Sequence, residues 1–371
     1  MILHIITGLG DGGAEGVLYR LCKHDREHRH AVISLMDGGK YEAPLLELGI
    51  PVHSLGLGRG RVSLGAVWRL AKLIRHYKPD VVQTWLYHAD LIGGTLARVL
   101  RVPRVSWGIR HGELPAGKTK RSTVTVARLC ARLSRVVPDA IVSCSAGAKA
   151  IHADLGYDPT KFHVIPNGYE VDNLAPDPEA RKAFRAELGV SEDVPLLGMV
   201  SRFSPQKDHP NLFRALSQLA LQGRPFEVAL VGTGLSPDNA ELMQLAAELR
   251  LAERIHWLGR RNDIAKVMNG LDIHVLSSAS EGFPNVVAEA MLCGTPCVVT
   301  DVGDAAPMVG QTGWVAPPSD STALASATAQ ALDTMRDGSE WERRKAAGRA
   351  RVVSQYGIDA MVAAYHRVWH G

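Results

Sequence analysis

Short apolar runs alternate with segments of helical period along the 371-residue chain. This alternation is typical of parallel sheets whose strands are joined by crossover helices. In runs such as DAIVSC (139–144) the hydrophobicity is continuous, which indicates strands buried on both faces. In the first half, the pattern predicts helices at 64–77 and 88–100 and strands at 2–6, 31–36, 51–55, 80–84, 103–107, 139–144 and 162–165.

The composition changes after Ile165-Pro166-Asn167-Gly168, where a polar, proline-containing segment follows. A second strand–helix series then begins, with strands predicted at 196–201, 226–231, 254–258, 272–277 and 296–300. We therefore expect two α/β domains. Two such domains that meet at a hinge leave a cleft facing the carboxyl ends of both sheets, where these folds bind ligands.

The overall composition is that of a globular protein, with 46% hydrophobic and 22% charged residues. The five cysteines form no C-x-x-C pair, and their odd number argues against a disulfide framework. The first apolar run is too short for a signal peptide, and no run approaches the roughly 18 residues of a spanning helix. We expect a cytoplasmic protein, at most peripheral on the inner face of the membrane.

The net charge of +4 is unevenly distributed. Residues 98–135 contain ten Lys/Arg and one acid, Glu113, so this segment carries +9 and the rest of the chain −5. Within it, helical spacing predicts a basic stripe (Arg128, Arg132, Arg135) beside an apolar stripe (Val126, Leu129, Cys130, Leu133, Val137). Two interpretations stay open: an ordinary surface helix, or a face for an anionic membrane or a polyprenyl-diphosphate-linked acceptor.

The opening stretch TGLGDGGAEG (7–16) contains G-x-G-x-x-G at Gly8, Gly10 and Gly13, directly after an apolar run. Such a loop is typical of dinucleotide-binding folds, in which a pyrophosphate lies on the helix N-terminus. Asp37, after the next apolar run, is a candidate ribose ligand in that interpretation. Taken alone, the loop therefore suggests an NAD-dependent oxidoreductase.

The second half contains two groups of candidate residues at predicted strand ends. VSRFSPQKDHP places Arg202 and Lys207 where two cations suit a diphosphate, although surface charges are equally common there. SSASEGFPNVVAEAM places Glu281 in a loop and Glu289 in a helix that begins near Asn285. A helix N-terminus attracts anions, so the phosphate belongs there and the carboxylates suit sugar hydroxyls.

Together, these segments resemble the family-four glycosyltransferases of the GT-B fold. The resemblance rests on Gly-Gly-Ala-Glu near the N-terminus, His-Gly at 111–112, I-P-N-G at 165–168, Arg202, Lys207, and EGFPNVVAEAMLCGTPCVVTDVGD at 281–304. It implies an α/β protein with two Rossmann-like domains whose parallel sheets face a central cleft. Residues 1–168 would form the acceptor domain, completed by a C-terminal helix at about 355–371, and residues 169–354 the donor domain.

The resemblance also implies roles for individual residues. Arg202 and Lys207 would bind the diphosphate, Glu281 the hydroxyls of the donor sugar, and Glu289 the ribose, so Asp37 loses its proposed role. His111 would lie near the transferred sugar and the acceptor. The remaining implied donor-binding residues are Gly12, Gly13, Arg260, Phe283, Pro284, Asn285 and Val286.

These assignments imply a retaining enzyme that needs no metal or other cofactor. The two cations and the helix N-terminus can stabilise the leaving diphosphate, and no D-x-D cluster stands at a predicted strand end. No acid is an evident nucleophile. In the mechanism that the resemblance implies, the leaving phosphate oxygen itself deprotonates the acceptor, and we adopt this as a hypothesis. One departure from the family is Asp208-His209, where Gly often follows the phosphate lysine.

The expected reaction transfers a hexose or N-acetylhexosamine from a nucleotide-diphosphate sugar, with UDP favoured, to a glycan or lipid-linked acceptor. This would serve cell-surface polysaccharide or glycoconjugate synthesis, and no nucleic-acid partner is expected. Three alternatives stay open: a sugar-nucleotide epimerase of the same fold, a non-catalytic nucleotide-sugar-binding module, and the NAD-dependent oxidoreductase.

Overall fold

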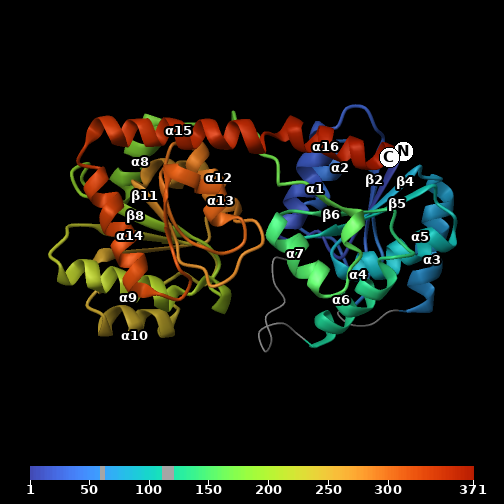
Figure 1. Cartoon of the computed structure of the whole chain (residues 1–371), viewed down its shortest axis with the longest axis horizontal. Coiled ribbons are helices and arrows are strands. Elements are labelled where there is room, and N and C mark those ends of the chain that lie inside the picture. The colour runs from blue at the N-terminus through green and yellow to red at the C-terminus, as the bar shows by residue number, and fades with distance from the viewer. Residues whose placement is uncertain (59–62, 111–120) are drawn as a thin grey trace. The chain divides into compact units, whose positions relative to one another are not determined.

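The computed structural model describes residues 1–58, 63–110 and 121–371, which divide into two units (Figure 1). Unit 1 consists of Met1–Tyr169 and Tyr356–Gly371, and unit 2 is Glu170–Gln355. Each contains one parallel sheet, as the alternation of apolar runs predicts. No helix in the described part of the chain is both long and apolar enough to cross a membrane.

The sheet of unit 1 has the strand order β3-β2-β1-β4-β5-β6-β7, with every pair parallel. Its strands are β1 Ile2–Ile6, β2 His30–Ser34, β3 Val52–Ser54, β4 Val81–Trp85, β5 Arg104–Ile109, β6 Ala140–Ser143 and β7 Phe162–Val164. β1, β2, β4 and β6 are buried along their whole length, in agreement with their continuous hydrophobicity. The strand order reverses between β1 and β4.

Helices cover both faces of this sheet and form two apolar cores. Leu18, Leu21, Tyr365 and Trp369 belong to the core under α1 and α16, whereas Leu70, Trp107 and Cys130 belong to the core under α3 and α6. The helices of unit 1 are α1 Gly13–His24, α2 Glu42–Glu47, α3 Leu64–Tyr77, α4 Tyr87–Ala89, α5 Thr95–Val99, α6 Arg121–Leu133, α7 Ala146–Asp154 and α16 Ile358–His370, with the 3-10 turn Pro159–Lys161.

The helix predicted at 88–100 is confirmed, because residues 87–99 are helical without a break. The prediction did not include the π-helical turn Asp90–Gly94 that lies between α4 and α5. A Cβ on Gly94 would lie 2.2 Å from Nε1 of Trp107, so the chain approaches β5 too closely for any larger residue. The buried Asp90 also accepts a hydrogen bond from Thr84 Oγ1 at 2.5 Å. Close packing on the sheet, rather than helix propensity, decides this segment.

α6 packs on the sheet with most of the predicted apolar stripe. Cys130 and Val137 are buried, and the partly buried Val126 and Leu133 pack against the same core. Leu129 is instead 40% exposed, and Ala127 and Ala131 complete the buried face. The predicted basic stripe of Arg128, Arg132 and Arg135 is exposed. Lys118 and Lys120 lie outside the described residues.

I-P-N-G, predicted as a linker, is also the docking site of the last helix. A Cβ on Gly168 would lie 2.8 Å from Cβ of Met361, and Arg20 Nε donates to the Gly168 carbonyl at 2.8 Å. Tyr169 N donates to Tyr356 O at 2.9 Å. These contacts attach the C-terminal α16 to the first part of the chain.

The sheet of unit 2 has the order β10-β9-β8-β11-β12-β13 and reverses between β8 and β11. Its strands, all parallel, are β8 Leu196–Val200, β9 Glu227–Val231, β10 Ile255–Gly259, β11 Ile273–Leu276, β12 Cys297–Thr300 and β13 Trp314–Ala316. The prediction missed β13, a three-residue edge strand. Its length gives little hydrophobic pattern to detect.

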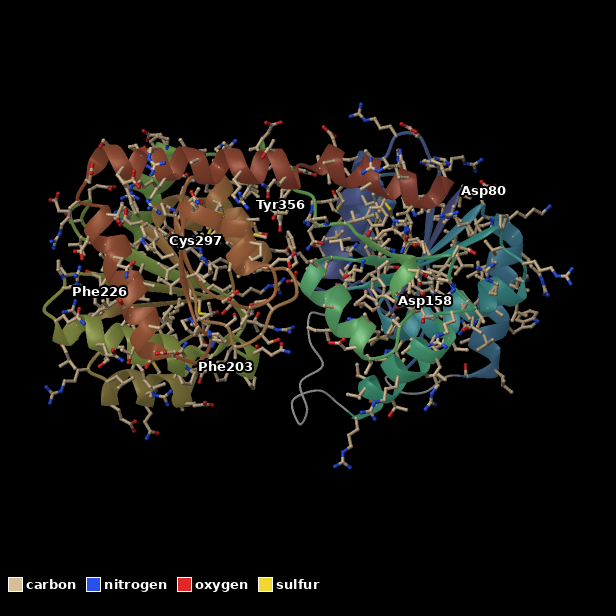
Figure 2. All side chains as sticks on the ribbon, viewed as in Figure 1. Asp80, Asp158, Phe203, Phe226, Cys297 and Tyr356 are labelled. Carbon is tan, nitrogen blue, oxygen red and sulfur yellow. The ribbon has the colours of Figure 1, made fainter. Side chains whose placement is uncertain are left out.

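Helices cover both faces of this sheet too. They are α8 Pro178–Leu188, α9 His209–Leu221, α10 Ala240–Glu248, α11 Ile264–Gly270, α12 Asn285–Leu292, α13 Ala305–Val309, α14 Ser321–Thr334 and α15 Gly338–Tyr356, with 3-10 turns at Pro205–Lys207, Ala252–Arg254 and Gly310–Thr312. Phe226 precedes β9 and Phe203 follows β8, so their side chains mark opposite edges of the sheet (Figure 2).

Candidate functional site

The candidate site lies at the carboxyl edge of the unit 2 sheet. Because all strands are parallel, the loops that follow them emerge at this one edge. The loop after β8 carries Arg202 and Lys207, and the loop after β11 carries Glu281. β8 and β11 are the neighbours between which the strand order reverses, which is where open α/β sheets bind ligands.

Hydrogen bonds join these two loops. Ser277 Oγ donates to the Lys207 carbonyl at 2.9 Å and lies 3.2 Å from the Asp208 carbonyl. Ala279 N donates to Gln206 O at 2.8 Å. The backbone around Lys207 is therefore fixed against the strand end that leads to Glu281.

The side chains of Lys207 and Glu281 form an ion pair. Ser278 Oγ also donates to Glu281 Oε1, at 2.6 Å, and the Ser278 carbonyl accepts from Thr300 Oγ1 at 2.6 Å. Lys207 and Glu281 are mostly buried, with side chains 17% and 12% exposed. Arg202 is exposed and has no ion pair among the described residues, so its guanidinium is available to an anion.

Two glycines are required by the shape of these loops. Gly303, after β12, has φ +54°, and a Cβ there would lie 2.5 Å from the Glu281 carbonyl oxygen. Gly232, after β9, has φ +144°, and its Cβ would lie 1.8 Å from the Ser201 carbonyl oxygen. Both backbones therefore support the loops that carry Glu281 and Arg202.

Asp208, which departs from the expected family pattern, adopts a left-handed conformation with φ +47°, a region that glycine enters most easily. Aspartate tolerates this region better than most residues, and here its side chain caps α9 by accepting from Asn211 N at 3.3 Å. Ser319 Oγ donates to its other carboxylate oxygen at 3.0 Å.

Two buried histidines lie beneath the loops. Burial, with a contribution from the charge of Lys207, lowers the pKa of His209 to about 4 and that of His274 to about 3. Both imidazoles are therefore neutral at pH 7, and His209 Nε2 lies 3.2 Å from Ser201 Oγ. The positive charge of these loops rests on Arg202 and Lys207.

The other predicted donor-site residues lie along the same edge. Arg260 follows β10 and is exposed. Phe283 and Pro284 are buried. Pro284 stands at the N-cap of α12, and its side chain makes no capping hydrogen bond to the backbone N–H groups of the first turn of α12. Asn285 and Val286 form the first turn, and Glu289 lies partly buried in the next.

The two predicted glycines of unit 1 lie at the carboxyl edge of its own sheet. Gly12 and Gly13 are exposed and begin α1, just after the loop that follows β1. His111 lies outside the described residues. The preceding Arg110, which the sequence did not single out, donates to Asn167 Oδ1 at 2.8 Å and lies 4.9 Å from the ring of Trp85. It links the end of β5 to I-P-N-G.

Sequence reasoning also missed the residues that support the Lys207–Glu281 pair: Ser277, Ser278 and Thr300. Ser277 and Ser278 are fully buried, directly after an apolar strand. Two adjacent hydroxyls at the end of a buried strand need hydrogen-bond partners. This pair of hydroxyls was the feature of the sequence that could have pointed to Ser277 and Ser278.

Two family models match the chain in succession. "Glycosyltransferase Family 4" matches residues 11–173 and "Glycosyl transferases group 1" matches residues 194–334. The chain belongs to this family of glycosyltransferases. It is 26% identical over 310 residues to the putative glycosyltransferase EpsF of Bacillus subtilis, covering 81% of this chain and 79% of EpsF.

A second relative is the UDP-Gal:alpha-D-GlcNAc-diphosphoundecaprenol alpha-1,3-galactosyltransferase of Escherichia coli. It is 27% identical over 236 residues, which cover 63% of this chain and 60% of that enzyme. Among solved structures, Anabaena HepE in complex with UDP-glucose has a TM-score of 0.85 at 23% identity, covering 100% and 99% of the two chains. The predicted GT-B fold is confirmed, and the protein is a glycosyltransferase that acts on nucleotide sugars.

Proposed function

We propose that the protein is a retaining glycosyltransferase that moves a hexose or N-acetylhexosamine from a UDP-sugar to a glycan or lipid-linked acceptor. The observation that carries this proposal is the Lys207–Glu281 pair at the point where the sheet of unit 2 reverses. It places a cation for a phosphate beside a carboxylate for sugar hydroxyls. Exposed Arg202 supplies a second cation from the same loop.

The same residues suit the chemistry of the leaving group. Negative charge increases on the diphosphate as the glycosidic bond breaks, and preorganised positive groups stabilise it. Arg202, Lys207 and the N-terminus of α12 have that role here, without a catalytic metal. The acceptor loses its proton to the leaving phosphate oxygen, and Glu281 binds sugar hydroxyls rather than acting as a nucleophile.

The relatives support the choice of donor and acceptor. The E. coli relative is named for UDP-Gal and a diphosphoundecaprenol-linked acceptor, and HepE was solved with UDP-glucose. We infer a UDP-sugar and a glycan or polyprenyl-diphosphate-linked acceptor, in cell-surface polysaccharide or glycoconjugate synthesis. The roles of Gly12, Gly13 and His111 stay predictions from the family resemblance.

A panel of nucleotide sugars tests the donor. UDP-, GDP-, ADP- and TDP-sugars are compared by thermal stabilisation, since a ligand that binds the folded state raises the melting temperature. UDP-sugars should give the largest shift. An epimerase would isomerise its nucleotide sugar without an acceptor, and a binding module would bind it without turnover, so analysis of the products separates all three.

Two further measurements test the mechanism. Activity measured well below the melting temperature should survive EDTA, and NMR of the product should show the anomeric configuration of the donor. An inverted linkage would contradict the mechanism but not the fold.

The two carboxylates should divide the donor between them. Glu289→Gln should mainly weaken binding of free UDP, because Glu289 is assigned to the ribose. Glu281→Gln should mainly slow sugar transfer, because Glu281 is assigned to the sugar. Calorimetry with UDP on both variants checks this, and equal loss of UDP affinity would refute the division.

The exposed arginines of α6 and of the turn that follows it suggest where the enzyme acts. Arg121, Arg128, Arg132 and Arg135 are all exposed. We propose that they bind the anionic inner face of a membrane, where each basic residue contributes about 1 kcal/mol. Co-sedimentation with anionic vesicles should fall at high salt and when all four arginines are changed to serine. Equal binding by both proteins would contradict this.

A further inference from the structure

A cluster of histidines lies at the amino edge of the unit 1 sheet, where β2 begins and α1 ends. Asp25 follows the last residue of α1, His30 begins β2, and His366 and His370 lie one turn apart on α16. His28 completes the group. The two chain ends lie side by side in this region (Figure 1). The loops of the candidate active site follow the opposite, carboxyl ends of strands.

Asp25 is the centre of this cluster, and its side chain is fully buried. Its Oδ1 accepts hydrogen bonds from the backbone N–H groups of Glu27 and His28 at 3.0 and 3.3 Å. His28 Nδ1 lies 3.0 Å and His30 Nε2 3.2 Å from Oδ2, and His366 Nε2 lies 3.1 Å from Oδ1. A buried carboxylate surrounded by imidazoles is also a set of metal ligands.

A hydrogen-bond chain determines the role of His30. The indole N–H of Trp85 can only donate, and it lies 3.2 Å from His4 Nδ1, so neutral His4 carries its proton on Nε2. That proton is donated to His30 Nδ1 at 3.0 Å. His30 therefore carries its own proton on Nε2, facing Asp25. His30 orients the carboxylate and is not itself a ligand.

The ring nitrogens of the other histidines near Asp25 have the arrangement of a metal site. The ligand atoms of Asp25, His28 and His366 all lie within 4.8 Å of one another. Among the described residues, His366 Nε2 and His30 Nε2 are both buried without a well-aligned hydrogen-bond partner. Ring centroids are 4.7 Å apart for His28 and His366, 5.2 Å for His28 and His370, and 6.2 Å for His366 and His370, so His370 would have to move closer to His366 to share an ion with it. Rings that share a tetrahedral zinc are about 5 Å apart, since Zn–N bonds are about 2.0–2.1 Å.

We propose that Asp25, His28 and His366 bind one Zn²⁺ ion, with His370 as the fourth ligand. Imidazole and carboxylate suit this ion, and His366 and His370 have the i, i+4 spacing that places two ligands on one helix face. A surface hollow lined by His28, Trp369 and His370 gives the ion access. Asp25 and His28 come from the first part of the chain and His366 from α16, so the ion fastens α16 to the N-terminal part of unit 1.

Metal titration of the untagged protein tests the site. After EDTA treatment and dialysis, Zn²⁺ should bind with one equivalent per chain and raise the melting temperature. Co²⁺ should give the intense visible absorption of a four-coordinate site. His366→Gln should weaken Zn²⁺ binding at least tenfold and remove the thermal shift, since a ligand is lost. His163→Gln, at an exposed histidine of β7, is the control and should bind like the wild type.

Two more variants keep the test decisive. If His366→Gln fails to fold, His28→Gln replaces it, because His28 lies in a loop and its loss should weaken Zn²⁺ binding equally. His30→Gln should weaken binding about tenfold but keep one equivalent, as expected for an orienting residue. Equal binding by the wild type and the ligand variants, or no binding by the wild type, would overturn the proposal. Transferase rates in EDTA are measured separately and test the catalytic proposal alone.

Discussion

Glycines at the carboxyl edges of the two sheets have two kinds of surroundings. Both sheets reverse their strand order there, between β1 and β4 in unit 1 and between β8 and β11 in unit 2. Gly232 and Gly303 in unit 2, and Gly39 in unit 1, pack against the backbone of neighbouring loops. In the loop after β1, by contrast, a Cβ on Gly10 would meet no atom of the described residues within 4 Å, and the atoms nearest to one on Gly12 are those of the Glu15 carboxylate.

This difference shows that a glycine-rich loop at a strand end has two possible purposes. In unit 2 the glycines let loops pack closely, which fixes charged side chains in one arrangement. In unit 1 the protein itself does not require glycine at Gly10 or Gly12, so the open backbone suits the approach of a ligand. G-x-G-x-x-G alone could not distinguish these purposes.

The largest expected effect comes from filling a packed glycine. Gly303→Ala combines a left-handed backbone with a contact to the Glu281 carbonyl, and should lower the free energy of unfolding by about 2–4 kcal/mol. Gly223→Ala is the control, since Gly223 has φ +72° but no atom within 4 Å of the added Cβ. Urea unfolding of both variants measures the clash, and equal losses would contradict the packing argument.

The second prediction concerns the cations at the edge of unit 2. Lys207→Ala and Arg202→Ala should each lower kcat/KM by roughly tenfold to a hundredfold, because each loses a charged hydrogen bond worth about 1.5–3 kcal/mol. Arg224→Ala is the matched control, because Arg224 precedes β9 at the opposite edge and pairs with Asp333. Steady-state kinetics with the preferred UDP-sugar should show no change for the control. Wild-type rates from the double variant would refute the phosphate assignment.

The third prediction is a loss of stability in acid. The folded-state pKa of His209, about 4, lies below the unfolded value of about 6.5. The unfolded state therefore binds more protons between these values, and stability falls as the pH drops from 6.5 to 4. At pH 5 the resulting loss in the free energy of unfolding is about 2 kcal/mol. Urea unfolding at pH 7.5 and 5 should show a smaller loss for His209→Gln, and the same loss would exclude His209 as the cause.

The smallest effect on stability is expected in unit 1. Gly12→Ala should change the free energy of unfolding by less than about 1 kcal/mol, since Gly12 has φ −125° and its only close neighbour is a flexible side chain. Its kcat/KM should nevertheless fall if the backbone approaches the donor. Gly58→Ala, at another exposed loop glycine, should leave both quantities unchanged. A large loss of stability in Gly12→Ala would remove the contrast between the two edges.

The order of strands and helices could be predicted because buried parallel strands produce long apolar runs. The helix predicted at 64–77 coincides with α3, and the helix predicted at 88–100 is present over 87–99. Its π-helical turn could not be predicted, because the close approach of Gly94 to Trp107 is a contact between distant residues. The candidate site residues could be named because Arg202, Lys207 and Glu281 stand next to strand ends. Ser277 and Ser278 could have been noticed as adjacent hydroxyls at the end of an apolar strand, but their hydrogen-bond partners could not be predicted, since these depend on which strands are neighbours.

Contacts between segments that are distant in the sequence also explain why the histidine cluster was not predicted. Asp25, His28 and His30 are close together in the sequence, but His366 is far from them and no local spacing relates it to Asp25. Only the packing of α16 on the first part of the chain brings His366 to them. A sequence pattern reports neighbours along one helix or strand, whereas these contacts cross elements.

The central claim is that the carboxyl edge of the unit 2 sheet binds the diphosphate and sugar of the donor. A crystal structure of the protein with the intact UDP-sugar tests it most directly. We predict the diphosphate within hydrogen-bond distance of Arg202 and Lys207, with sugar hydroxyls on Glu281. A nucleotide bound elsewhere, with Lys207 and Glu281 still paired only to each other, would contradict the claim.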